Sequence, residues 1–192
     1  MFGVPRIIGL SGSLRSESFN GKLLRAAVTL APPGTTIEVA SIRGVPLYDY
    51  EVEASSGIPP EVATLKDLVA GADGLLLVTP EYNNSMPGVF KNAIDWMSRP
   101  PADIPRVFGG RPVGLIGATP GPGGTMLSQA AWLQVLRTLG TLPFFGGRVM
   151  ISGASKVFDD RGELVDATER ARLEKYLAGF ARFVEQHGPH RG

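Results

Sequence analysis

Short apolar runs bounded by glycine or proline alternate along this 192-residue chain with longer segments whose apolar residues recur at helical spacing. This alternation is typical of the strands and helices of an α/β fold. None of the short runs shows the alternating polar residues of a half-exposed strand, so each strand is expected to be covered on both faces. The expected strands are residues 6–10, 36–40, 74–79, 112–118 and 146–151.

Five longer segments are expected to form helices, and they cover residues 23–28, 62–69, 87–97, 127–134 and 166–187. Pro87 suits the first turn of the third helix. Asp166 and Glu169 form a capping-box-like start for the last one. Five strand–helix units with right-handed crossovers predict a flavodoxin-like, doubly wound parallel sheet of order 2-1-3-4-5, with helices on both faces. A single domain over residues 1–192 is expected, with a surface loop at residues 48–60.

The chain contains no cysteine. This excludes disulfides, thiolate nucleophiles and cysteine-bound metal or iron–sulfur sites, so any redox chemistry would need a bound cofactor. Lysine and arginine number 19 against 18 acidic residues, and the net charge of +1 gives no electrostatic reason to expect nucleic acid or an anionic membrane as a partner. The first ten residues lack the apolar core of a secretory signal, so a cytoplasmic location is expected.

In an open α/β sheet, ligands bind beyond the carboxyl ends of the strands, where the strand order reverses. The loop after the first strand, residues 9–20, combines small and hydroxyl-bearing residues ahead of a helix start. Ser13, Arg15, Ser18, Asn20 and free backbone N–H groups could surround a phosphate there. Alternatively, Ser18 or Asn20 only caps the helix. The loop lacks both the Walker Gly-Lys-Ser/Thr and the GxGxxG pattern, so a monophosphate such as that of FMN fits best.

The loops after the third and fourth strands are also unusual in composition. Residues 79–88 contain two prolines and Tyr82, so this stiff loop could offer backbone groups to the edge of a flat heterocycle. Alternatively, Tyr82 only shields the core. Residues 117–124 are rich in glycine and proline, which would either allow close approach to a ring or simply turn the chain into the next helix.

Three stretches together resemble the NAD(P)H-dependent FMN reductases and, within that family, the bacterial chromate and quinone reductases. They are Gly12-Ser13-Leu14-Arg15 with Ser18-Phe19-Asn20, Pro80-Glu81-Tyr82-Asn83, and Lys91-Asn92-Ala93-Ile94-Asp95-Trp96. The resemblance implies FMN as cofactor, no metal, and no protein side chain as acid or base. It places the FMN phosphate at Ser13, Arg15, Ser18, Phe19 and Asn20, and the isoalloxazine beside Pro80, Glu81, Tyr82, Asn83 and Thr119.

The same resemblance implies an oxidoreductase that uses NADPH or NADH and forms a homodimer or homotetramer. Hydride would pass to FMN and on to a quinone or another small acceptor (chromate, an azo or nitro compound, free flavin) by a ping-pong mechanism. Asn92, Asp95, Trp96 and Arg99 offer a polar and aromatic surface for assembly, unless Trp96 lies in the core of one subunit. The arginines considered for contact with the 2′-phosphate of NADPH are Arg15 and Arg111.

Other classes share this fold and cofactor. A flavodoxin-like electron carrier would be strongly acidic, so the near-neutral charge of this chain favours an enzyme. A non-enzymatic FMN-binding regulator would hold the cofactor without turnover. A flavin reductase that serves a separate monooxygenase would release its flavin rather than retain it.

Overall fold

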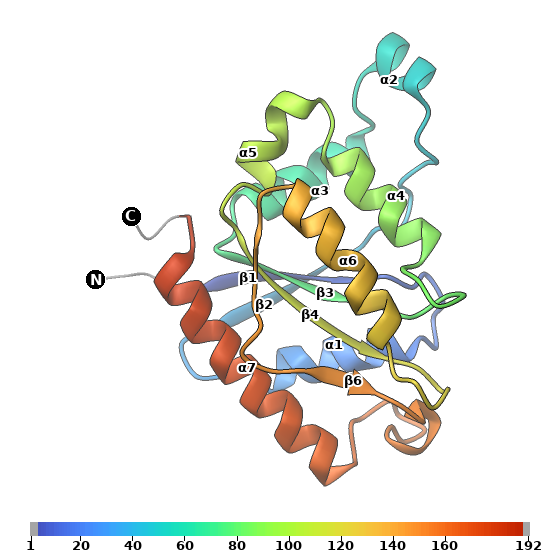
Figure 1. Ribbon diagram of the computed structural model, residues 1–192, viewed down its shortest axis with the longest axis vertical. Coiled ribbons are helices and arrows are strands. Elements are labelled where there is room, and N and C mark those ends of the chain that lie inside the picture. The colour runs from blue at the N-terminus through green and yellow to red at the C-terminus, as the bar shows by residue number, and fades with distance from the viewer. Residues whose placement is uncertain (1–3, 190–192) are drawn as a thin grey trace.

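The computed structural model describes residues 4–189. Within them a parallel sheet has the strand order β2-β1-β3-β4-β5, and β6 also pairs with β4 (Figure 1). The order 2-1-3-4-5 predicted from the sequence is therefore confirmed. The strands are β1 (Arg6–Ser11), β2 (Thr36–Ala40), β3 (Gly74–Val78), β4 (Pro112–Ala118), β5 (Leu142–Pro143) and β6 (Val149–Ile151).

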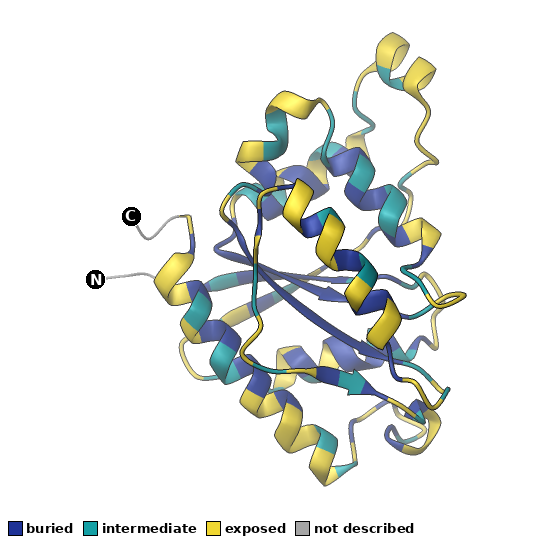
Figure 2. Cartoon of the chain, in the orientation of Figure 1, coloured by how far each residue is buried: buried dark blue, intermediate teal, exposed yellow. Residues whose placement is uncertain are grey.

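Helices cover both faces of the sheet, as Figure 1 shows. Alternate residues of β3 point to opposite faces, so Leu75 and Leu77 join one apolar core while Leu76 and Val78 join the other. The first core is closed by α3 (Pro60–Ala70), α4 (Gly88–Met97) and α6 (Met126–Thr138), and the second by α1 (Phe19–Thr29) and α7 (Ala167–His187). The central strands are buried throughout (Figure 2). These are the five helices that apolar spacing predicted.

The fifth strand differs from the expected continuous strand at 146–151. It is divided into β5 and β6, and the residues between them leave the sheet edge. The Phe144 N–H still bonds to the Val113 carbonyl at 2.8 Å, but its ring packs against Tyr176 of α7, 5.3 Å between centroids. Opposite the gap, the Leu115 N–H donates to the Tyr176 hydroxyl at 2.9 Å instead of to a neighbouring strand. An aromatic contact therefore draws the chain away from β4.

The surface loop expected at residues 48–60 is instead largely helical, which corrects that prediction. It contains the short helix α2 (Tyr50–Ser56), and Asp49 caps it by accepting from the Glu51 N–H at 2.8 Å. None of the residues of α2 is buried, and the helix protrudes from the body of the molecule (Figures 1 and 2). A helix without a buried face has no apolar stripe, so helical periodicity could not reveal it.

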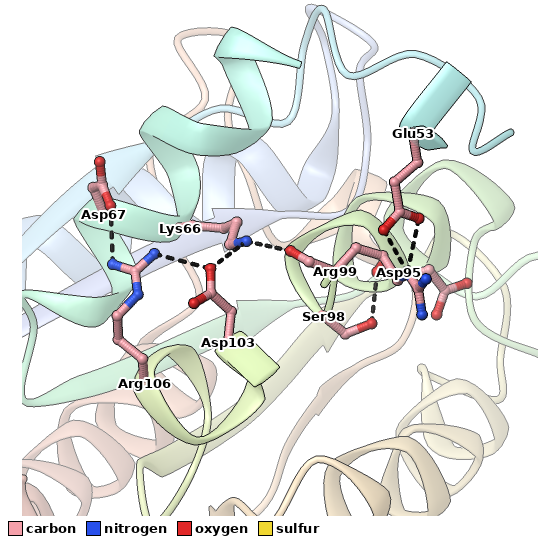
Figure 3. A network of polar contacts seen from close by, with 8 residues as sticks. All are labelled: Glu53, Lys66, Asp67, Asp95, Ser98, Arg99, Asp103 and Arg106. Atoms are coloured by element: carbon pink, nitrogen blue, oxygen red, sulfur yellow. Dashed lines mark hydrogen bonds and ion pairs between the residues drawn. The ribbon is translucent and has the colours of Figure 1, made fainter. Parts of the chain in front are cut away.

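Polar contacts rather than apolar burial hold this arm, residues 46–57. Arg99 pairs with Glu53 at 2.8 Å, and the guanidinium keeps the pKa of that carboxyl below its usual range. The Tyr48 hydroxyl also donates to Glu53, and this bond raises the tyrosine pKa. Behind Arg99, Lys66 donates to the Arg99 carbonyl and pairs with Asp103 at 2.6 Å (Figure 3). The chain of contacts joins α2 to the main body.

The expected assembly surface at Asn92, Asp95, Trp96 and Arg99 is not an open surface. Trp96 is fully buried, and its indole N–H donates to the Pro46 carbonyl at 2.9 Å. Asn92 bonds to the same carbonyl and also accepts from the Tyr48 N–H. These side chains anchor the arm within one subunit, so the alternative of a core tryptophan is confirmed.

Arg111 does not meet the expectation that it contacts a nucleotide. It lies just before β4 with only 2% of its surface exposed, and burial lowers its pKa to about 10. Its guanidinium donates to four backbone carbonyls, those of Ala70, Ala72, Arg106 and Val107. The side chain therefore fastens the loop before β4 to the end of α3, and it is not available to a 2′-phosphate.

We expect Arg111→Met to lower the free energy of unfolding by roughly 2–4 kcal/mol, because the buried carbonyls of Ala72 and Val107 would lose a charged donor. Urea denaturation would measure the change. The matched control is Arg137→Met, since Arg137 is exposed on α6. A loss below about 0.5 kcal/mol, the scale of a surface substitution, would show that the guanidinium makes no net contribution to the free energy of unfolding.

Candidate functional site

Three loops meet at the carboxyl edge of the sheet, each joined to the neighbouring strand by a backbone hydrogen bond of 2.9 Å. The loop after β1 bonds to the end of β3, the loop after β3 bonds to β4, and the loop after β4 bonds to the end of β6. The three bonds are Gly12 N–H to Val78, Thr79 N–H to Ile116, and Thr119 N–H to Ile151. All the residues predicted for the site lie on these loops or in the first turn of α1.

Backbone donors gather at the start of α1. Ser18 is the N-cap of the helix, and its hydroxyl oxygen accepts from the N–H groups of Asn20 and Gly21 at 3.2 and 3.4 Å. From Leu14 to Phe19, the first residue of α1, the N–H groups of four residues find no acceptor in the described part of the chain: Leu14, Ser16, Glu17 and Phe19. Unpaired N–H groups at a helix N-terminus form an anion-binding site.

Asn20 has a different contact from the one expected. Its carboxamide accepts from the Ala118 N–H at 2.9 Å and donates to the Ala118 carbonyl at 2.8 Å, and it is buried. Only the second amide hydrogen is left for a ligand. The side chain therefore positions α1 against the end of β4, a role that nothing in its sequence surroundings indicated.

The loop after β1 also packs tightly against its neighbour. A Cβ on Gly12 would overlap the Phe90 ring of α4 and come within 2.9 Å of Pro80 Cδ. Glycine at this position lets the first two loops of the site touch. Pro80 is buried beneath that contact.

Tyr82 is placed by a tight turn. Tyr82 and Ser85 exchange two backbone hydrogen bonds of 3.0 Å, and the two residues between them, Asn83 and Asn84, have φ angles of 50° and 61°. Positive φ at both central positions is the geometry of a type I′ turn, and asparagine tolerates it better than most residues. The turn leaves Tyr82 48% exposed beside the site.

Glu81 uses its carboxylate to cap α6, the helix that follows the third loop. Its Oε2 accepts from the N–H groups of Leu127 and Ser128 at 2.9 and 3.0 Å, so this acid caps α6. The contact satisfies donors at the start of that helix and places a negative charge at its positive end. Because the carboxylate is engaged in this way, Glu81 has its backbone rather than its side chain to offer a ligand.

Thr119 begins the third loop, half-buried. Its carbonyl accepts from the Ala154 N–H at 3.0 Å, and its hydroxyl oxygen accepts from the Gly121 N–H at 3.4 Å. The same segment also makes an aromatic contact with α1, because the Phe158 ring stacks on the Phe19 ring at 6.1 Å between centroids. Residues 153–158 therefore support the site, and their ordinary composition gave no signal of it.

Arg15 lies exposed at the rim. Its guanidinium carbon is 5.9 Å from the centre of the Phe19 ring, and one terminal nitrogen donates to the Glu17 carbonyl at 2.9 Å. The remaining guanidinium donors face no acceptor in the described residues. The Ser13 hydroxyl oxygen accepts from the backbone N–H of Arg15 at 3.4 Å. The donor set of this loop therefore suits a phosphate.

Comparison with known proteins agrees with this geometry. A family model described as NADPH-dependent FMN reductase matches residues 5–156. A NAD(P)H-dependent FMN reductase of Pseudomonas aeruginosa is 43% identical, over 94% of this chain and 96% of the relative. A 2-hydroxy-1,4-benzoquinone reductase of a Burkholderia species is 38% identical, over 93% and 96%.

One solved structure is similar over nearly its whole length. It is FerB, a flavoenzyme NAD(P)H:(acceptor) oxidoreductase from Paracoccus denitrificans, with a TM-score of 0.86 and 32% identity, covering 96% of this chain and 100% of that one. Fold and site thus define a flavodoxin-like flavoprotein. The chain belongs to the NADPH-dependent FMN reductase family, and it is an oxidoreductase that uses FMN and a nicotinamide cofactor.

We expect Gly12→Ala to raise the Kd for FMN by about tenfold, because overpacking against Phe90 costs on the order of 1–3 kcal/mol and the loop would relieve it by moving. Fluorescence quenching of FMN would measure the affinity. Gly123→Ala is the matched control, since a Cβ on Gly123 meets nothing within 4 Å. Equal affinity of the two variants would mean that close packing at Gly12 does not shape the site.

Proposed function

We propose that this protein, as a single FMN-binding domain, oxidises NADPH or NADH and reduces a quinone in a ping-pong cycle at one open site. Chromate, azo and nitro compounds and free flavin are further candidate acceptors. The observation that carries the proposal is the set of unpaired N–H groups at the start of α1, beside an exposed tyrosine at the strand-order reversal. Relatives named as quinone reductases, such as that of Escherichia coli at 36% identity, support the choice of acceptor.

The loop after β1 would hold the FMN phosphate. The N–H groups of Leu14, Ser16, Glu17 and Phe19 point to an anion at the positive end of α1. The Ser18 hydroxyl accepts both its capping bonds through lone pairs, so its proton is available to a phosphate oxygen. Ser13 adds a hydroxyl group, and the guanidinium of Arg15 adds charged N–H donors for the phosphate. Asn20 acts mainly by holding the helix in place.

The loop after β3 would contact the isoalloxazine. Pro80 supplies a rigid buried base, the backbone of Glu81 and Asn83 supplies hydrogen-bonding groups, and Tyr82 supplies an aromatic wall. Thr119 contributes from the opposite side of the site. When bound, FMN supplies the hydride and electron transfer at its N5. The protein residues bind and orient the reactants, and no side chain is assigned an acid or base role.

Absorbance spectra test the proposal directly. Protein incubated with FMN and desalted should stay yellow, lose its colour with NADPH under anaerobic conditions, and regain it on addition of a quinone. Parallel double-reciprocal lines are expected for the two substrates, and intersecting lines would contradict a ping-pong cycle. Retained colour that NADPH does not bleach would identify an electron carrier or a regulator instead. Flavin lost on desalting would favour a reductase that releases reduced FMN.

We expect Arg15→Gln to weaken FMN binding by about tenfold, the scale of one charge-assisted hydrogen bond. The loss should shrink at high salt, because Arg15 is exposed and its charge is screened. Equilibrium titration of FMN at two salt concentrations would measure both effects. Arg182→Gln, an exposed site on α7, is the control. An unchanged Kd in Arg15→Gln would remove this residue from the phosphate site.

We also infer a homodimer or homotetramer and a cytoplasmic location. The arm at residues 46–57 presents Leu47 and Tyr50 with 81% and 61% of their surfaces exposed, which is apolar area suited to a second subunit. In the described part of the chain no helix has the length and apolar character to span a membrane.

If the arm takes part in assembly, Leu47→Ser with Tyr50→Ser should shift the mass measured by light scattering toward the monomer. The Kd for FMN should change little, because neither residue belongs to the phosphate loop. Val165→Ser, an exposed apolar residue outside the arm, is the control. A wild-type protein that is monomeric at micromolar concentration would contradict the inference.

A further inference from the structure

The loop after β1 has little support on the side that faces β2. A cavity of about 280 Å³ lies there, lined by Ser13 and Leu14 of the loop, by part of α1, and by residues 39–42 at the end of β2. Leu14 is itself exposed, so its side chain does not fill this space. Apolar packing therefore does not fix the loop against β2.

One hydrogen bond reaches the loop from this side. The Arg43 guanidinium donates to the Leu14 carbonyl at 2.6 Å. In the described part of the chain, no other hydrogen bond joins residues 13–17 to a residue outside the loop. Lys22 of α1 adds an ion pair with Glu17 at 3.4 Å, but the Glu17 side chain is 76% exposed and such a pair contributes little. The bond from Arg43 is therefore the main polar link between the middle of the loop and the rest of the protein.

The turn after β2 holds Arg43 in place. Ile42, the preceding residue, is buried in the core, and the Ser41 hydroxyl oxygen accepts from the Arg43 N–H at 3.1 Å. Gly44 follows with a φ of 86°, a conformation that glycine adopts without strain. The Arg43 guanidinium is exposed, and its bond to Leu14 is its only one among the described residues. The backbone of Arg43 is thus fixed, and its side chain is left for the loop.

The bond also sets the direction of a peptide group in the loop. In a planar trans peptide the C=O and N–H groups point in opposite directions. Because the Leu14 carbonyl points to Arg43, the N–H of Arg15 points away from the turn after β2. Its acceptor, the Ser13 hydroxyl oxygen, is 3.4 Å away, which is beyond the usual range for a hydrogen bond. This N–H is therefore largely available to a ligand oxygen, and the charged donor on the carbonyl polarises the peptide and strengthens it as a donor.

We infer that Arg43 is a positioning residue for the FMN phosphate, because its bond to the Leu14 carbonyl orients the Arg15 N–H as a further phosphate donor. The inference rests on the proposed placement of the phosphate in this loop. Arg43 acts through the position of the loop and not through its own charge. Its removal should therefore weaken the binding of a flavin that carries a phosphate and spare one that does not.

Fluorescence titration with FMN and with riboflavin tests this inference. Arg43→Met should raise the Kd for FMN about fivefold, the effect of one hydrogen bond, and leave the Kd for riboflavin within about twofold of wild type. The loss should persist at high salt, because salt screens charges and not the geometry of a peptide group. Arg25→Met is the matched control and should bind FMN like wild type. Arg25 also lines the cavity and is exposed, but its side chain makes no hydrogen bond or ion pair with the described residues.

Tryptic cleavage gives a second readout, because trypsin cuts after Arg15 in the exposed part of the loop. In the FMN-free protein, this cleavage should be several times faster in Arg43→Met than in wild type or Arg25→Met, since the loop would open more often. Equal rates in the three proteins would contradict a positioning role.

The titrations separate failure of this inference from failure of the proposed site. Equal affinity of the wild-type protein for FMN and riboflavin would remove the phosphate site, and this inference with it. A wild-type preference for FMN that Arg43→Met retains in full would overturn the inference alone. A loss that disappears at high salt would show that Arg43 acts by its charge. Weakening of riboflavin by the same factor as FMN would show a general structural role, and both results contradict the inference.

Discussion

The two hydrogen bonds between the Asn20 carboxamide and the backbone of Ala118 join the first turn of α1 to the last residue of β4. They cross 98 positions of sequence and lie in the buried interior of the site. Because they fix where α1 begins, they also fix the direction of the unpaired N–H groups that precede it. The placement of the phosphate loop therefore depends on a side chain that itself makes its contacts with protein.

The other two loops are held in the same manner, by protein contacts that leave ligand-facing groups free. The Glu81 carboxylate accepts hydrogen bonds from the start of α6. Gly12 lets the first loop pack against Pro80 and Phe90. Such internal support strengthens a binding site, because a cofactor binds most tightly when the groups that contact it are already in position. Some residues of the site therefore face the ligand, and others position them.

Sequence patterns predicted the parts of the fold that depend on burial. The first four strands and the five helices with an apolar stripe were found, because burial on one or both faces imposes a period that can be read directly. The helix α2 was missed because it buries nothing, and an ion pair between Glu53 and Arg99, 46 positions apart, holds it. The break in the fifth strand depends on Phe144 packing against α7, which no local pattern reveals.

The candidate site was predicted less completely, for the same reason. The sequence located the loops and their donors, but it could not show that Asn20 and Glu81 bond to distant backbone groups or that Trp96 anchors the arm. The turn at Asn83 and Asn84 has a sequence signal in its paired asparagines, the residues most tolerant of positive φ after glycine. Contacts between residues far apart in sequence are what the structure adds.

The central claim is that the loop after β1 recognises the flavin through its phosphate. The most direct measurement compares the Kd of FMN with that of riboflavin, which has the same ring system and no phosphate, on the wild-type protein. Several charge-assisted hydrogen bonds at the start of α1 predict that FMN binds at least about a hundredfold more tightly. Equal affinity for the two flavins would contradict the account, because the unpaired donors of residues 14–19 would then have no part in binding.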